Sequence, residues 1–201
     1  MTLDWRLTPE FDGGGNIGSV LGVARDVTAL HNASTDLRLA FERTQAETNA
    51  MAWIVSDPSI ANGDIPALAK IISEMAAQVL RIERVSLWLF DEPCENLVCI
   101  QLYERTPQRF SSGAILSVEQ YASEFAALET VKFIAADRAS EEPRMAGYVE
   151  GYIKPIGITA MLDAVVRASG RNLGTLCFEQ TGKPHHWEQD EITFACQLAD
   201  Q

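Results

Sequence analysis

The 201 residues carry a formal net charge of -12, and 47% of them are hydrophobic while 22% are charged. This balance allows a buried core and excludes wholesale disorder, and the length suits one full domain and part of a second. Such an acidic surface repels phosphate backbones and anionic lipid, so we expect no nucleic-acid partner. No apolar run approaches the ~20 residues that span a bilayer, and the N-terminus does not read as a secretory signal.

Residues 1–28 predict a β-hairpin, because two strand-like runs, WRLTPEF and IGSVLGVARDV, flank the turn sequence DGGGN. A single hairpin cannot bury a core. It is therefore either a local hairpin or the end of a larger sheet domain. The aromatic-plus-basic first strand and the GVARDVT ending resemble the last two strands of a PAS domain, which would be incomplete here. The matching residues are Trp5, Arg6, Pro9, Asp12, Gly22, Arg25, Asp26, Val27 and Thr28.

Residues 29–55 lack Gly and Pro and predict one long helix. Leu30, Leu37 and Met51 follow a seven-residue spacing, and Phe41 and Val55 fit the companion positions of a weak heptad. The helix is therefore either a single amphipathic connector or the seam of a parallel dimer. Residues 56–65 are rich in Asp, Pro, Ser, Asn and Gly, and we interpret them as a linker at the domain boundary.

Residues 66–201 predict one α+β domain, with an antiparallel sheet and helices on its faces. A capping-box pattern of Ser117 and Gln120 predicts a helix start at Ser117. The expected elements are a helix from 66, strands at 84–93 and 96–105, a helix from 117, a strand at 131–137, an interrupted helix at 141–155, a hairpin at 158–180 and a helix at 188–201.

Residues 183–192, KPHHWEQDEI, could form either a metal site or the start of the last helix. Adjacent residues of an extended chain point in opposite directions, so His185 and His186 do not suit one metal ion. Glu188, Asp190 and Glu191 instead provide the negative charge that stabilises a helix N-terminus. We therefore interpret this stretch as a helix start, with Trp187 packed against the core.

Residues 64–201 contain the segments ITAMLDAVV, LGTLCFE and TGKPHHW and an acidic last helix that ends in FACQLAD. Through these segments they resemble a GAF domain of the kind found in bacterial histidine kinases and diguanylate cyclases. Val165 departs from the family's Pro, Ala160 from its Ser, and His186 or its neighbour from the Arg before Trp187. The matching residues are Asp137, Pro143, Arg144, Ile158, Met161, Leu162, Asp163, Gly170, Gly174, Cys177, Glu179, Gly182, Trp187, Phe194, Ala195, Ala199 and Asp200.

The resemblance implies a GAF-like fold, preceded by the hairpin and the connector helix, and a sensory module of a cytoplasmic signal-transduction protein. We expect it to bind an unidentified small molecule, to form a homodimer and to pass the signal to an output domain after residue 201. No Cys-His pair is present, so we expect no covalent bilin. We expect no enzymatic activity of this fragment. The alternatives are a ligand-free dimerisation module and a GAF-type methionine sulfoxide reductase, for which Cys94 and Cys99 would have to meet.

The four cysteines form no C-x-x-C pair, and we interpret them as reduced, mostly core thiols. Asp163 interrupts the apolar run AMLDAVV, so its carboxylate needs a partner if it is buried. That partner is either structural, such as Arg144 or backbone N–H groups, or a ligand. No catalytic or metal-binding set is predicted. The candidate ligand-binding residues are Trp88, Phe90, Tyr103, Phe133, Asp137, Arg144, Tyr152, Met161 and Asp163.

Overall fold

The computed structural model describes residues 1–201, which form two compact units, Met1–Gln45 and Ala46–Gln201. The expected hairpin, long helix and α+β domain are all present. None of the helices combines the length and apolar character that crossing a membrane requires.

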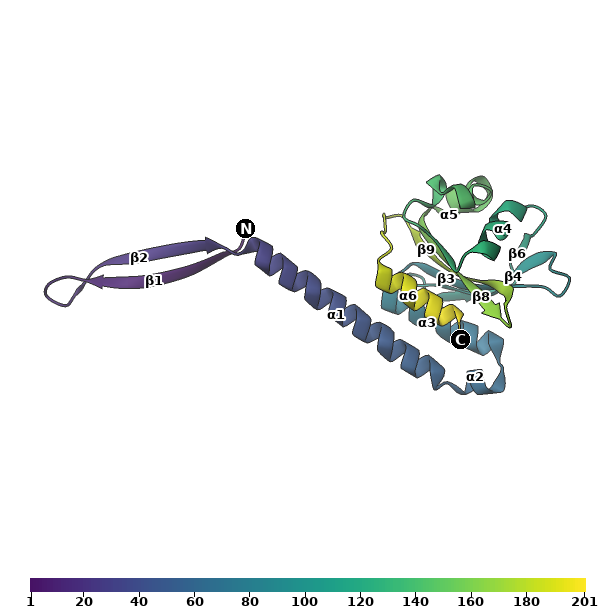
Figure 1. Cartoon of the computed structure of the whole chain (residues 1–201), viewed down its shortest axis with the longest axis horizontal. Helices are drawn as coiled ribbons and strands as arrows, with labels where there is room; N and C mark the ends of the chain where they lie inside the picture. The colour runs from purple at the N-terminus through teal and green to yellow at the C-terminus, as the bar shows by residue number, and fades with distance from the viewer. The chain divides into compact units, whose positions relative to one another are not determined.

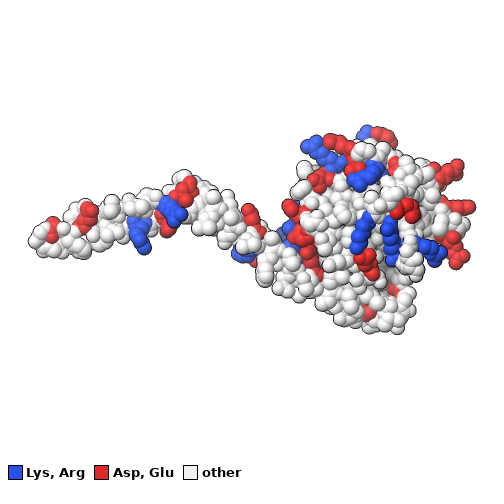
Figure 2. All heavy atoms as spheres, viewed as in Figure 1, with Lys and Arg blue, Asp and Glu red and all other residues white.

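The first unit contains the antiparallel hairpin of β1 (Leu3–Phe11) and β2 (Ile17–Asp26). The turn is closed by the Asp12 carboxylate, which accepts hydrogen bonds from the backbone N–H groups of Gly14 and Asn16. Trp5 and Leu7 lie on one face of the ribbon and remain exposed. Most of the hairpin's visible surface carries no charge (Figure 2).

Helix α1 (Thr28–Val55) begins where the Asp26 carboxylate accepts a hydrogen bond from the Thr28 backbone N–H. Leu30, Leu37 and Phe41 of the predicted heptad are exposed along it. Near its end the helix buries other residues, among them Ala50 and Ile54, in the core of the second unit.

The second unit is built on a seven-stranded sheet in which every strand pair is antiparallel. The strand order is β5-β4-β3-β9-β8-β7, and β6 pairs with the other part of β4. The strands are β3 (Arg84–Phe90), β4 (Asn96–Glu104), β5 (Arg109–Ser111), β6 (Ile115–Ser117), β7 (Phe133–Ala136), β8 (Ile158–Ala168) and β9 (Arg171–Thr181).

Helices cover both faces of this sheet, as the α+β prediction requires (Figure 1). On one face, α3 (Ile65–Leu80) and α6 (Gln189–Ala199) enclose a core with Leu162 and Phe178 at its centre. On the other face, a second core contains Trp88, Met161 and Cys177. Its covering elements are α4 (Ala122–Thr130), η1 (Ala139–Glu141), η2 (Pro143–Met145), the π-helix η3 (Val149–Ile153) and α5 (Lys154–Ile156).

One local prediction is wrong, and one segment predicted as a linker contains a short helix. The capping box expected at Ser117 does not form, because the backbone of Ile115–Ser117 pairs with β4 as strand β6, and α4 begins only at Ala122. The segment 56–65, predicted as a linker, contains the short helix α2 (Pro58–Asn62), which begins after Asp57. The Asp57 carboxylate accepts a hydrogen bond from the Ser59 N–H and so caps this helix.

The helix-start interpretation of residues 183–192 is confirmed. Glu188 and Glu191 form a reciprocal capping box at the start of α6. The two histidines contact different carboxylates: His185 Nε2 lies 3.0 Å from a Glu191 oxygen, and His186 bonds to Asp137. Trp187 is buried in the core beneath α6, as expected.

Candidate functional site

Strand alternation places Met161 and Asp163 of β8 on the face that carries the second core. Their cross-strand partners on β9, Glu179 and Cys177, lie on the same face. A cavity of about 20 Å³ lies here, which is room for about one water-sized group. Its walls are formed by Trp88, Leu97, Leu116, Leu128, Tyr148, Tyr152, Met161, Asp163, Thr175, Cys177 and Glu179.

Asp163 is the unusual group in this wall. It is 3% exposed, and its Oδ1 atom has no hydrogen-bond partner. Burial raises the pKa of the Asp163 carboxyl to about 7, against a hydrogen bond with the Cys177 thiol that lowers it. The charge of Glu179 adds to the rise. A carboxyl in this setting is poised to change its protonation state near neutral pH when a new partner arrives.

Arg144, considered as a partner of Asp163, lies elsewhere. Its Nε donates to Glu142 Oε1 over 2.6 Å, within the short helix η2 and its cap. The two residues form a local pair at the surface because Glu142 caps the same turn that Arg144 occupies. The structure thus leaves Asp163 without a basic neighbour in its cavity wall.

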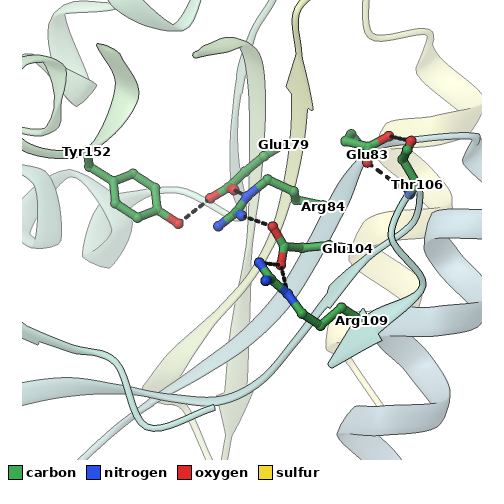
Figure 3. Close-up of polar contacts among 7 residues, drawn as sticks. All are labelled: Glu83, Arg84, Glu104, Thr106, Arg109, Tyr152 and Glu179. Carbon is green, nitrogen blue, oxygen red and sulfur yellow. Dashed lines mark hydrogen bonds and ion pairs between the residues drawn. The ribbon is translucent and has the colours of Figure 1, made fainter. Parts of the chain in front are cut away.

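Glu179 is the second carboxylate of the cavity, and each of its two oxygens accepts a hydrogen bond. Its Oε1 accepts a 2.7 Å hydrogen bond from the Tyr152 hydroxyl, and its Oε2 accepts one of 2.7 Å from Arg84 Nε. Arg84 also donates to Glu104, which in turn accepts from Arg109 (Figure 3). These charged residues are direct cross-strand neighbours on β9, β3, β4 and β5, so they form a row of alternating charge across the sheet.

Four of the nine candidate ligand-binding residues line the cavity: Trp88, Tyr152, Met161 and Asp163. Phe90 belongs to the same core but packs edge-on against Phe125, with 5.7 Å between ring centroids.

The other four candidates lie outside the cavity. Tyr103 and Phe133 contribute to the core on the opposite face of the sheet. Phe133 alternates with Ile134, whereas the bulge in β4 turns Tyr103 away from the face of Leu97 and Cys99. Asp137 lies near the surface, where its carboxylate accepts a 3.0 Å hydrogen bond from the Trp187 N–H and bonds to His186. Arg144 is held by Glu142.

Seven lining residues were not among the candidates. Three of them, Thr175, Cys177 and Glu179, alternate along β9, and the register of this strand with β8 places them on the cavity face. The rest come from strands β4 and β6, from α4 and from the residue before η3. They are Leu97, Leu116, Leu128 and Tyr148.

A larger cavity, of about 300 Å³, lies on the opposite face, among residues of α3, α6 and the ends of β3, β8 and β9. Its walls are mostly apolar. Its two charged residues already have partners: Arg167 donates to the carbonyls of Leu128, Glu129 and Val131, and Asp200 pairs with Lys132. The smaller cavity is the better candidate because it holds a buried polar atom that lacks a partner.

The family described as GAF domain matches residues 64–201. The chain belongs to the GAF family. A search among curated proteins gives no match.

Solved structures of GAF domains share the fold. The GAF domain of an Acinetobacter phosphoenolpyruvate-protein phosphotransferase is 16% identical, with a TM-score of 0.60 over 78% of this chain and 87% of that one. The corresponding domain from Coxiella burnetii is also 16% identical, with a TM-score of 0.60 over 80% and 90%. The chromophore-binding domain of a Stigmatella aurantiaca bacteriophytochrome is 11% identical, with a TM-score of 0.62 over 79% and 58%. At these identities the likeness shows the fold alone.

The four thiols of this GAF domain are free, and three of them are buried. Burial raises the pKa of Cys99 to about 11, and it raises the pKa of Cys177 and Cys196 as well. A thiol must ionise to act as a nucleophile, so these three are poorly suited to redox catalysis at neutral pH. Cys94 lies exposed between β3 and β4 while Cys99 is buried within β4, which disfavours the reductase alternative.

Proposed function

We propose that this GAF domain is a sensory module that binds a small molecule in the cavity beneath α4 and η3. The observation that carries the proposal is Asp163, a buried carboxyl in the cavity wall whose Oδ1 lacks a hydrogen-bond partner. A buried polar atom without a hydrogen bond costs stability. Groups of this kind concentrate at functional sites, where a ligand supplies the missing bond. The names of two solved relatives, a PixJ receptor and a chromophore-binding domain, support a sensory role.

Signal output would use α1. The buried residues Ala50 and Ile54 near its end pack in the core between the sheet and the helices α3 and α6, and the cavity lies on the other face of the sheet. A ligand that favours one arrangement of the sheet would therefore shift the packing of α1. The exposed heptad residues Leu30, Leu37 and Phe41 support a parallel homodimer through this helix.

The wider context follows from the same proposal. The exposed apolar face of the hairpin, with Trp5 and Leu7, supports its assignment to the end of a PAS domain. A PAS end, a signalling helix over 29–55 and a GAF domain over 66–201 suit a cytoplasmic sensor protein with a histidine kinase or diguanylate cyclase output. Such a two-component or cyclase protein would carry the catalytic activity in its output domain.

Native mass spectrometry of the chain purified from its own organism tests the ligand directly. We expect a co-purifying molecule of low mass that is present on wild-type protein and absent from Asp163→Asn. A bare protein mass in every preparation, together with no thermal shift across a metabolite library, would contradict the proposal.

The second candidate function is a ligand-free dimerisation module. The cavity volume of about 20 Å³ favours it, because the side chains already fill most of the space beneath α4. In that case Asp163→Asn would leave every activity of the longer protein unchanged, whereas a seam variant such as Leu37→Lys would abolish it.

A further inference from the structure

We propose that the cavity recognises a small organic cation, whose alkylammonium head group lies between aromatic rings and the Asp163 carboxylate. This inference rests on the proposed function, since it names the class of ligand that the same cavity would take.

The polar groups of the wall define what is missing. Trp88 Nε1 donates to Ser86 Oγ over 2.8 Å, and Thr175 Oγ1 donates to the Ala164 carbonyl over 3.2 Å. The Tyr152 hydroxyl is already engaged with Glu179. The Cys177 thiol bonds to the Asp163 carboxyl, and the Tyr148 hydroxyl also lies in the wall, yet Asp163 Oδ1 has no hydrogen-bond partner. A ligand that completes this wall must bring a donor.

The charges of the wall select a cation. The cavity is lined by two carboxyl residues, Asp163 and Glu179, and by no Lys, Arg or His. Arg84 balances Glu179 from the far side, where its Nε and Nη1 are occupied by Glu179 and Glu104. The pKa of Asp163 is about 7, and above that pH an anionic ligand would meet the Asp163 carboxylate with no cation to offset it, which is costly at low dielectric. A phosphate or carboxylate ligand is therefore disfavoured.

The aromatic rings suit a cation that carries methyl groups. Trp88, Tyr148 and Tyr152 line the same cavity as Asp163, and the rings of the two tyrosines stand 6.5 Å apart at 62°. Ring faces attract ammonium groups, and several rings beside a carboxylate form the kind of aromatic cage that binds alkylated ammonium ions. The volume of about 20 Å³ holds one water-sized group, so an alkylammonium head group would enter by displacing neighbouring side chains.

The test uses the 201-residue chain and probes matched in shape. Methylammonium, trimethylammonium and choline are the cations. The neutral counterpart is 3,3-dimethyl-1-butanol, which replaces the charged nitrogen of choline with carbon, and the anion is 3,3-dimethylbutanoate. We expect at least one cation to raise the melting temperature by about 3 °C or more at about 10 mM, relative to equal NaCl. The neutral and anionic probes should give no such shift.

Variants locate the effect. Asp163→Asn keeps the shape of the side chain and removes its charge, so it should weaken cation binding by at least about tenfold. Asp137→Asn, a surface carboxyl of the same domain, should leave binding unchanged. If Asp163→Asn does not fold, Tyr148→Leu and Tyr148→Phe provide the second comparison. The leucine variant loses the ring and should lose the thermal shift, whereas the phenylalanine variant keeps both.

The outcomes separate this inference from the function on which it rests. If the neutral or anionic probe binds as well as choline, or if cations bind Asp163→Asn as tightly as wild type, the cation assignment is overturned and ligand sensing stands. If no probe of any charge binds and no small molecule co-purifies with the chain, both are overturned.

Discussion

Glu179 and Arg84 face each other on neighbouring strands, with 2.7 Å between Glu179 Oε2 and Arg84 Nε. Their side chains are 1% and 12% exposed, so this is a buried ion pair. The Tyr152 hydroxyl occupies the other oxygen of Glu179. The pair allows a second carboxylate to line the smaller cavity without an uncompensated charge, which leaves Asp163 as the group available to the proposed ligand.

Removing the arginine of this pair should destabilise the domain strongly. Arg84→Met leaves the Glu179 carboxylate buried without its cation, and we expect the free energy of unfolding in urea to fall by about 3 kcal/mol. Arg109→Met serves as the matched control, because its side chain is 67% exposed at the outer end of the same row, and it should cost less than about 1 kcal/mol. Equal losses for the two variants would contradict the importance of burial here.

Titration of Asp163 should make the free energy of unfolding depend on pH. Its pKa is raised in the folded state to about 7, so between about pH 4 and 7 the folded chain holds a proton that the unfolded chain has released. The contribution of Asp163 to stability is therefore present at low pH and is lost as the pH rises to about 7. The neighbouring groups Cys177, Glu179 and Tyr148 remain in both proteins being compared.

The comparison is wild type against Asp163→Asn in urea at pH 4.5, 6 and 8. The wild-type chain loses the contribution of Asp163 as the pH rises, and Asp163→Asn does not. The free energy of unfolding of the variant, relative to that of wild type, should therefore increase from pH 4.5 to pH 8. Asp137→Asn should behave in the opposite way: bonds from the Trp187 N–H and His186 outweigh burial and lower the pKa of Asp137, so its contribution is lost as the pH falls. A pH-independent difference for Asp163→Asn would show that its pKa is ordinary.

Gly174 should tolerate no side chain. Its φ is +153°, and a Cβ atom there would lie 2.0 Å from the Trp88 carbonyl oxygen and 2.8 Å from Leu89 Cα. Both neighbours are backbone atoms of β3, so neither can move aside cheaply. We expect Gly174→Ala to lower the free energy of unfolding by at least about 2 kcal/mol. Gly13→Ala, where no atom lies within 4 Å of the added carbon, should be nearly neutral; similar losses at both sites would refute this reading.

If α1 forms the proposed dimer seam, a charged substitution should weaken dimerisation at a seam position and not at a neighbouring exposed position. Leu37 and Leu39 are both exposed leucines of α1, but only Leu37 falls on the heptad positions shared with Leu30 and Phe41. Sedimentation equilibrium should show that Leu37→Lys weakens dimerisation by at least about tenfold, because a charge at a core position of the seam must be desolvated. Leu39→Lys should sediment as wild type does. A wild-type chain that stays monomeric at high concentration would contradict the proposed dimer through α1.

Much of the fold could be predicted from local patterns. The hairpin over 158–180 formed as expected because Ser169 and Gly170 supply the two positive-φ positions of its tight turn. The start of α6 was predictable for an equally local reason, since a capping box lies within four residues. Strands β5 and β6 were not predicted. Each has three residues and is defined by pairing with β4 rather than by its own sequence.

The site was harder to predict because it depends on register. From its turn, the hairpin pairs Ala168 with Arg171, and simple counting would then place Leu176 opposite Asp163. The structure has a bulge between Val166 and Arg167, and the pairing beyond it moves by one residue, so that Cys177 lies opposite Asp163. A shift of one residue exchanges the faces of a strand. The bulge thus brings Cys177 and Glu179 into the cavity wall, which the sequence pattern alone could not reveal.

The sensing account is tested most directly by a crystal structure of the chain purified from its own organism. It predicts electron density for a bound small molecule within hydrogen-bonding distance of Asp163 Oδ1, in contact with the rings of Trp88 and Tyr152. A cavity that holds only water, or a bound molecule found instead in the larger cavity between α3 and α6, would contradict it.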